Sequence, residues 1–140
     1  MKAIKRKHIY IAAPWIKGGD ALEARNLLVR AGIEVTSRWL DRVKGNTDPS
    51  YDYTKDPTYT APDAKVEAQK DIEDVMRADA VVVINSAKSE GKAVEQGIAL
   101  AHGIPIIVVG ERTNTFQYFD PPKVSVVGSV EDAIELIRDL

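Results

Sequence analysis

The sequence contains no cysteine and only two histidines, His8 and His102. Without thiols, the chain has no disulfide framework, no cysteine nucleophile and no thiolate metal site. Two histidines are too few for a histidine-rich metal centre, so we expect no metal. A dominant charge is also missing, because 19 Lys and Arg stand against 21 Asp and Glu, a formal net charge of −2. Binding of a nucleic acid polymer would therefore require a local basic patch.

Long apolar runs are missing as well. The longest, residues 78–84 with Asp79 inside and residues 104–109, fall far short of the roughly 20 residues that cross a bilayer. An apolar stretch near the N-terminus, residues 9–13, ends at Pro14 and is shorter than the ~7–15 residues of a signal-peptide core. We therefore expect a soluble, cytoplasmic protein with no membrane partner.

The chain has 140 residues, 44% of them hydrophobic and 29% charged, which suits one globular domain with a sizeable core. Short apolar runs bounded by turn residues predict strands at residues 8–12, 33–37, 80–85, 104–109 and 124–127. The third and fourth of these runs are almost entirely Val and Ile, a pattern typical of strands buried on both faces of a parallel sheet.

Helical segments alternate with these strands. We expect helices from Asp20 to about residue 31, from Thr60 to about 77, from Gly91 to about 101, and after a capping box that starts at Ser129. The alternation predicts an α/β fold, namely a doubly wound, five-stranded parallel sheet of flavodoxin-like or Rossmann-like type with helices on both faces. This single domain would span residues 1–140.

Residues 38–62 interrupt the alternation as a long insert. Loops of this length in compact domains are usually functional lids or disordered segments. We expect the insert to form part of a ligand pocket or its lid, with Trp39 and a tyrosine such as Tyr51 or Tyr53 as stacking surfaces. A core or subunit-interface role for Trp39 is an equally good interpretation.

Ligands of doubly wound sheets bind beyond the carboxyl ends of the strands, near the switch in strand order. This rule selects the loops after Ala12, after Asn85 and after Val109. In the first loop, the pair Gly18-Gly19 can present backbone N–H groups to an anion at a helix start, although its spacing is not a dinucleotide fingerprint. Lys17 would add charge there, or would simply be a solvated lysine.

Two carboxylates are the main candidates for chemistry. Glu95 is expected in the first turn of its helix at the ligand edge, where the alternative is a glutamate that merely favours a helix N-terminus. Asp71 borders the apolar face of its helix, whereas Glu73 and Asp74 are expected to be solvated surface charges. Together, Glu95 and Asp71 supply the two-carboxylate arrangement that glycosyl transfer uses. Tyr10, inside the first strand, is either a core tyrosine or a hydroxyl that reaches a carboxylate.

These residues belong to an ordered pattern. Tyr10 and Asp71 precede the motif Ser89-x-Gly91-x-x-x-Glu95-x-Gly97-x-Ala99, and Gly103-x-Pro105 and another apolar strand follow. In order and spacing, the chain from residue 8 to 109 resembles the nucleoside 2-deoxyribosyltransferase superfamily, including its 2′-deoxynucleoside 5′-phosphate N-hydrolases. The insert and the C-terminal third match this pattern less clearly.

The resemblance implies a role for each matching residue. Glu95 would be the nucleophile that attacks C1′ of the deoxyribose and forms a glycosyl-enzyme ester. Tyr10 would orient the Glu95 carboxylate, and Asp71 would assist departure of the base and then activate the acceptor. A carboxylate suits this chemistry because the transition state is oxocarbenium-like. The resemblance implies no cofactor, and it implies a homodimer or higher homo-oligomer in which a neighbour's loop, here residues 112–117 with Asn114, completes the site.

The residue six positions before the nucleophile distinguishes two branches of this superfamily. Transferases usually carry an Asp there, which meets the 5′-hydroxyl, whereas the nucleotide hydrolases carry a Ser that contacts the 5′-phosphate. A buried Asp would repel a phosphate dianion, but the Ser89 hydroxyl and the Gly91 amide can donate to it. Further substrate contacts are expected from Ala13, Lys17, Gly18, Gly19, Arg38, Trp39 and Asn114.

The resulting prediction is an enzyme that cleaves the N-glycosidic bond of a 2′-deoxynucleoside 5′-monophosphate. The nearest alternative is a transferase that exchanges bases on free deoxynucleosides. A second alternative is a non-catalytic nucleotide-binding or sensing domain in which Glu95 only contacts the ligand. A phospho-acceptor signalling domain is excluded, because Ala12-Ala13-Pro14 stands where its acidic cluster would follow the first strand.

Overall fold

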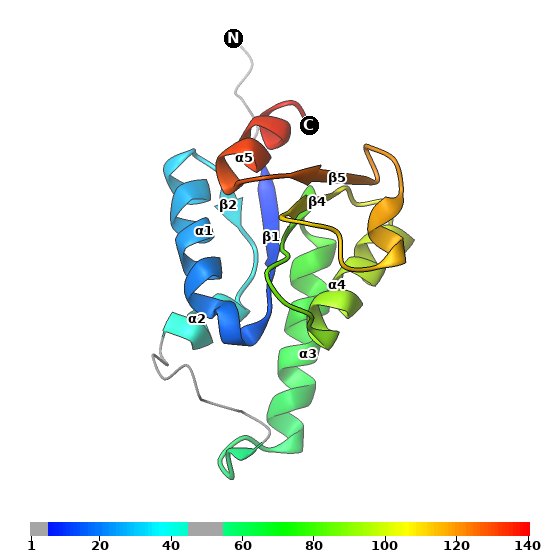
Figure 1. The fold of residues 1–140 in the computed structure, drawn as a ribbon. Helices are drawn as coiled ribbons and strands as arrows, with labels where there is room; N and C mark the ends of the chain where they lie inside the picture. The colour runs from blue at the N-terminus through cyan, green and yellow to red at the C-terminus, as the bar shows by residue number, and fades with distance from the viewer. Residues whose placement is uncertain (1–5, 45–54) are drawn as a thin grey trace.

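The structure, a computed structural model, describes residues 6–44 and 55–140. Its centre is a five-stranded sheet in which all neighbouring strands are parallel (Figure 1). The strands are β1 (His8–Ala12), β2 (Glu34–Val35), β3 (Ala80–Ile84), β4 (Ile106–Val109) and β5 (Val124–Val127). Their order, β2-β1-β3-β4-β5, confirms the doubly wound sheet predicted from the sequence.

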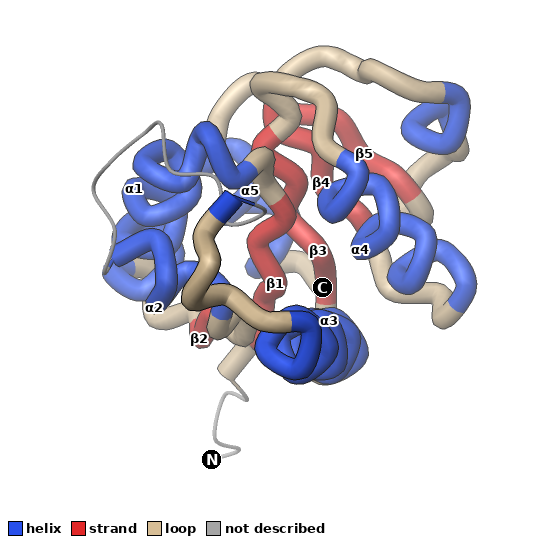
Figure 2. The backbone as a smooth tube through the Cα atoms, turned by 90° about the horizontal axis from the view of Figure 1, so that it is seen from below, coloured by secondary structure: helices blue, strands red, loops and turns tan. Residues whose placement is uncertain are grey.

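Helices cover both faces of the sheet. On one face, α1 (Gly18–Arg30) packs against α5 (Val130–Arg138), and on the other α3 (Ala61–Met76) packs against α4 (Glu90–Ala101), as Figure 2 shows. The short helix α2 (Trp39–Lys44) lies beside α1. This two-sided cover explains the apolar runs of the central strands, since every residue of β3 is buried.

Three polar side chains define where helices start. Thr60 accepts a hydrogen bond from the Asp63 amide in a reciprocal capping box at the start of α3. Ser89 and Ser129 accept equivalent bonds at the starts of α4 and α5. Such caps typically contribute about 0.5–2 kcal/mol each, so these boundaries are well determined by the sequence.

Some boundaries differ from the prediction. Helix α1 begins at Gly18, so Asp20 lies in its first turn and is not its cap. Helix α4 begins at Glu90, and Glu95 therefore lies in the second turn and not in the first. Strand β2 is shorter than the predicted residues 33–37, because the next two side chains bond to other elements. Thr36 Oγ1 donates to the Asp74 carbonyl of α3, and Ser37 Oγ accepts from the Ile11 amide of β1.

The predicted insert is in part helical. Its first residues form α2, which is held against α1 at a point where only glycine fits, because a Cβ on Gly18 would lie 2.5 Å from Val43 Cγ1. Tyr51 and Tyr53, the expected stacking residues, lie outside the described residues.

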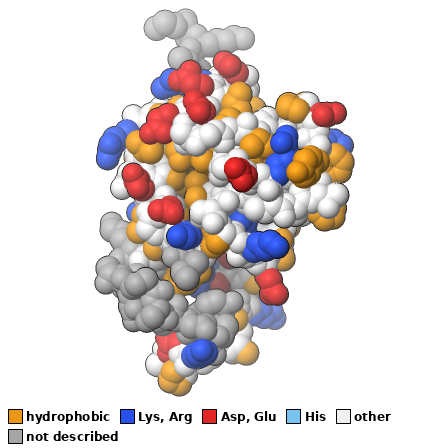
Figure 3. All heavy atoms as spheres, in the orientation of Figure 1, with side chains coloured by type: hydrophobic (Ala, Val, Ile, Leu, Met, Phe, Trp, Pro, Cys, Tyr) orange, Lys and Arg blue, Asp and Glu red, His pale blue; other side chains and the backbone are white. Residues whose placement is uncertain are grey.

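The surface charge and the helices are relevant to the nucleic-acid and membrane partners considered in the sequence analysis. On the face shown in Figure 3, acidic and basic side chains are interspersed. Within residues 6–44 and 55–140, no helix combines the length and the apolar character needed to cross a membrane.

Candidate active site

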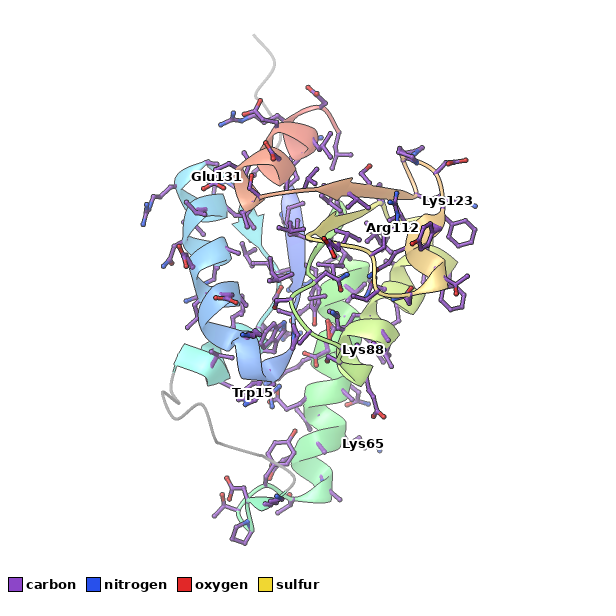
Figure 4. All side chains as sticks on the ribbon, in the orientation of Figure 1. Trp15, Lys65, Lys88, Arg112, Lys123 and Glu131 are labelled. Carbon is purple, nitrogen blue, oxygen red and sulfur yellow. The ribbon has the colours of Figure 1, made fainter. Side chains whose placement is uncertain are left out.

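A cavity of about 270 Å³ lies at the switch in strand order, beyond the carboxyl ends of β1 and β3. Helices α1 and α4 leave these two strands on opposite faces, so the elements diverge there. Figure 4 shows Trp15 and Lys88 at this edge of the sheet. The cavity is lined by Ala13, Trp15, Trp39, Arg42, Tyr59, Ala64, Glu67, Ala68, Asp71, Ser89, Gly91, Lys92 and Glu95.

The structure brings Tyr10, Asp71 and Glu95 together, although they come from β1, α3 and α4. Tyr10 is fully buried, and its hydroxyl lies within hydrogen-bonding reach of the Glu95 carboxyl. The contact is looser than a regular hydrogen bond, because Tyr10 Oη and Glu95 Oε2 are buried atoms without a partner of regular geometry. Catalytic hydrogen bonds often tighten only when substrate is bound.

Burial shifts the proton affinities of both carboxyls upwards. It raises the pKa of Glu95 to about 8, against a hydrogen bond from Tyr10 that lowers this pKa, and the Asp71 charge raises it further. Burial also raises the pKa of Asp71 to about 6, partly offset by the Arg42 guanidinium. The Tyr10 hydroxyl keeps its proton, since burial and the Glu95 charge raise the pKa of Tyr10 well above its usual range. Between about pH 6 and pH 8 the pair therefore holds a single proton, which lies mainly on Glu95, the carboxyl with the higher pKa.

Ser89 and Gly91 form the wall of the cavity at the start of α4. Ser89 Oγ accepts from the Lys92 amide at 3.3 Å, which leaves the hydroxyl proton free to donate. A Cβ on Gly91 would lie 3.8 Å from Glu95 Oε1 and 3.9 Å from Ser89 Oγ, in the space between these two side chains. Because glycine has no side chain, a ligand can reach the Glu95 carboxyl through this space. The N–H groups at the start of α4, which favour an anion, lie beside it.

Aromatic rings form the opposite wall. Trp39 is 5% exposed and donates from Nε1 to the Ile11 carbonyl at 2.9 Å, so it is both a core residue and a cavity residue. Trp15 packs against it at a centroid distance of 6.2 Å and an interplanar angle of 44°. Tyr59 also lines the cavity. Sequence reasoning singled out Trp39 and the tyrosines of the insert, of which Tyr59 is one, but missed Trp15.

Sequence reasoning also missed a charged pair in the cavity. Arg42 Nε lies 3.1 Å from Glu67 Oε2, and the guanidinium lies 5.4 Å from the centroid of the Trp15 ring. A helical spacing was the available signal, because Arg42 follows Trp39 by three residues and Glu67 precedes Asp71 by four. These spacings place each pair on one face of its helix.

Five of the predicted binding residues do not line this cavity, and one of them, Asn114, lines a second cavity described below. Lys17 is exposed, and Gly18 and Gly19 begin α1, where Gly18 serves the packing of α1 on α2. The guanidinium of Arg38 is engaged elsewhere: its Nε donates to Asp74 at 2.9 Å and its Nη2 to Glu73 at 2.9 Å.

The prediction that Asp74 is a solvated charge is wrong. Asp74 is fully buried, and it accepts hydrogen bonds from the Arg38 amide, the Arg38 guanidinium and Arg77. Desolvating a carboxylate is costly, and these charge-assisted bonds compensate for that cost. Through these bonds Asp74 holds Arg38, the residue before Trp39, against α3.

Asn114 caps a short helix, Thr115–Tyr118, in the connection from β4 to β5. It lines a second cavity of about 440 Å³, which shares Ser89 and Lys92 with the first. The contact with a neighbouring subunit expected of residues 112–117 stays a prediction. In the described part of the chain, no three His, Asp or Glu side chains are arranged to hold a metal ion.

The sequence matches no protein-family model and no curated protein. Solved structures do match. A conserved protein from Enterococcus faecalis V583 aligns with a TM-score of 0.62 and 20% identity over 96% of this chain and 99% of its own. A 2-deoxyribosyltransferase from the psychrotolerant bacterium Bacillus psychrosaccharolyticus aligns with a TM-score of 0.62 and 18% identity over 91% of this chain and 90% of its own.

A third match is the CMP N-glycosidase BcmB of Clostridium botulinum, with a TM-score of 0.57 and 16% identity over 96% of this chain and 100% of its own. At these identities the matches establish the fold. The resemblance found in the sequence is thereby confirmed at the level of the fold, which is that of the nucleoside 2-deoxyribosyltransferases.

Proposed function

From this shared fold, we propose that the chain is an enzyme that cleaves the N-glycosidic bond of a 2′-deoxynucleoside 5′-monophosphate. The products are the free base and deoxyribose 5-phosphate. The observation that carries the proposal is that Asp71 and Glu95 line one cavity, with the buried Tyr10 hydroxyl beside Glu95, and that burial raises the pKa of both carboxyls. Perturbed carboxyls that share a cavity are a physical signature of acid–base and nucleophilic chemistry.

In the first half of the proposed reaction, the Glu95 carboxylate attacks C1′ of the sugar. The bond from C1′ to the base nitrogen breaks, its electron pair leaves with the base, and the Asp71 carboxyl donates a proton to that base. The product is a glycosyl ester on Glu95. Tyr10 donates to the Glu95 carboxylate and holds it in line.

In the second half, water attacks C1′ and the ester bond breaks. The Asp71 carboxylate accepts the water proton, which returns it to its starting state, and the Glu95 carboxylate is regenerated. Two displacements at C1′ retain its configuration. The first half needs Glu95 ionised and Asp71 protonated, so the single proton of the pair must move from Glu95, which has the higher pKa in the free enzyme, to Asp71. The second half needs only the Asp71 carboxylate, because Glu95 is then an ester.

The proton count predicts a bell-shaped pH dependence of kcat/KM, with limbs near pH 6 and pH 8. Below the acid limb both carboxyls are protonated and no nucleophile exists, and above the alkaline limb no acid remains. Because the Tyr10 hydroxyl lowers the pKa of Glu95, Tyr10→Phe should lower kcat/KM and move the alkaline limb to higher pH. The measurement is initial-rate base release from pH 5 to pH 10.

Tyr118→Phe is the control for this profile, because Tyr118 is 68% exposed and lies outside the cavity. It should leave both limbs in place. An alkaline limb that stays fixed or moves to lower pH in Tyr10→Phe would contradict the role given to the hydroxyl.

A substrate panel tests the reaction itself. It contains deoxynucleosides, their 5′-monophosphates and the matching ribonucleotides, since the structurally similar N-glycosidase acts on CMP. Each compound is incubated with and without an added base, and the products are separated by chromatography. We expect base and deoxyribose 5-phosphate from a deoxynucleoside monophosphate without any acceptor. Turnover of free deoxynucleosides only with an added base would replace this proposal with the transferase, and binding without turnover would replace it with a nucleotide-binding domain.

A further inference from the structure

Lys92, on the first turn of α4, is a buried cation. It is 3% exposed, and its Nζ donates to Asn85 Oδ1 at 2.6 Å and to the Ala87 carbonyl. Both acceptors are uncharged. Within residues 6–44 and 55–140, no carboxylate forms an ion pair with Lys92. Burial lowers the pKa of Lys92, as expected for an ammonium that lacks a counter-charge.

A buried ammonium without a carboxylate is costly to keep. An ammonium also has three N–H donors, of which the described residues accept two. The third donor and the missing negative charge are the two features that a bound anion would satisfy.

The position of Lys92 indicates where this anion would lie. Lys92 and Ser89 line both the cavity that contains Glu95 and the neighbouring cavity of about 440 Å³. They therefore mark the junction of the two cavities, at the start of α4, where the Gly91 amide and the free Ser89 hydroxyl proton also lie.

We propose that Lys92 is a specificity-determining residue that binds the 5′-phosphate of the substrate at the junction of the two cavities. This inference rests on the proposed function. Lys92 takes the role that sequence reasoning gave to Lys17, which is exposed and lines neither cavity. The competing explanation is purely structural, with Lys92 tying residues 85–87 to α4.

The test is Lys92→Gln, which keeps an amide donor for Asn85 and Ala87 but removes the charge. The first readout is the ratio of kcat/KM for a deoxynucleoside monophosphate to that for the same free deoxynucleoside. We expect this ratio to fall by about tenfold to a hundredfold, the worth of one charge-assisted hydrogen bond. The second readout is the rise in melting temperature caused by deoxyribose 5-phosphate or inorganic phosphate, which should be lost.

Asn85→Asp is the second variant, in case Lys92→Gln does not fold. It places a carboxylate on the acceptor that lies 2.6 Å from Nζ and gives the ammonium an internal counter-charge. The proposal predicts a loss of phosphate binding here too, whereas a purely structural role of Lys92 predicts unchanged phosphate binding. The substitution also removes the Nδ2 donor to the Glu111 carbonyl and to Gln117 Oε1, so the melting temperature of this variant is first measured without ligand. Lys65→Gln, an exposed position on α3 (Figure 4), controls for the loss of one positive charge.

The outcomes separate this inference from the proposed function. If both substrates lose activity equally in Lys92→Gln, or phosphate still raises its melting temperature, the phosphate role of Lys92 is wrong. If no substrate of the panel releases base but deoxyribose 5-phosphate raises the melting temperature of the wild type and not of Lys92→Gln, the phosphate site stands and the enzymatic proposal fails.

Discussion

Replacing Glu95 by Gln is expected to lower kcat for base release by at least about a thousandfold, because a neutral amide cannot form the glycosyl ester. The change is close to isosteric, and the half-buried side chain lines the cavity and is not part of the apolar core. The loss should therefore be chemical, with little change in the fold. Steady-state release of base from the preferred monophosphate measures it.

Glu90→Gln is the matched control, since Glu90 is an exposed glutamate of the same helix and lies outside the cavity that contains Glu95. It should retain activity within a few-fold. Near-normal turnover in Glu95→Gln would contradict the assignment of Glu95 as the nucleophile, even if the cavity still binds nucleotide.

The same variant has a second expected effect, on stability. Burial raises the pKa of Glu95 from its ordinary value of 4.5 to about 8, so the folded state penalises the charged form. This penalty is absent below about pH 4.5, grows as the pH rises and is complete above about pH 8. Since one pKa unit corresponds to about 1.4 kcal/mol, Glu95→Gln should raise the free energy of unfolding by a few kcal/mol at pH 9 and change it little at pH 4. Urea unfolding at the two pH values measures this and confirms that the variant folds.

Ser89→Asp is expected to reverse the substrate preference. A carboxylate at the start of α4 would repel a phosphate dianion and remove the hydroxyl donor, whereas it can accept a bond from the 5′-hydroxyl of a free deoxynucleoside. Several charge-assisted contacts together are expected to favour the monophosphate by roughly a hundredfold or more in the wild type, and the variant should lose this preference. The ratio of kcat/KM for the two substrates measures the reversal.

Capping makes this substitution a clean test. Ser89 accepts from the Lys92 amide at 3.3 Å, and Asp is as good an N-cap residue as Ser, so α4 should keep its start. Ser89→Ala loses the cap and should only weaken the preference. Ser86→Asp puts the same charge on an exposed residue of the same loop and should leave the preference intact. A Ser89→Asp variant that still prefers the monophosphate would contradict the placement of the phosphate.

The strands and most helix starts were predictable because they depend on local patterns. The Val and Ile runs of β3 and β4 require a sheet covered on both faces, and Thr60, Ser89 and Ser129 are all observed helix caps. The edge of the sheet that carries the cavity also followed, since parallel strands that switch direction of connection leave a crevice at their carboxyl ends.

Residues whose role depends on contacts between distant segments were not predictable from one sequence. Asp74 is buried because Arg38, 36 residues away, donates to it, and nothing in its own helix indicates this. Likewise, Arg38 was expected at the substrate because it neighbours Trp39, but the backbone turns the two side chains to different partners. In the Ser89–Glu95 motif, Lys92 occupies an unspecified position, and its sequence neighbours do not indicate a role. Its burial depends on how residues 85–87 fold over α4.

Trapping of the covalent intermediate tests the central claim most directly. A 2′-deoxy-2′-fluoroarabinonucleoside 5′-monophosphate destabilises the oxocarbenium-like transition states, so the glycosyl-enzyme should persist after the base has left. Mass spectrometry of the quenched protein should then show the added mass of the fluorinated sugar phosphate. Fragmentation should locate it on Glu95 within the tryptic peptide of residues 93–112, separately from Glu111 of the same peptide. Release of base without any adduct, or an adduct on a residue other than Glu95, would contradict the account.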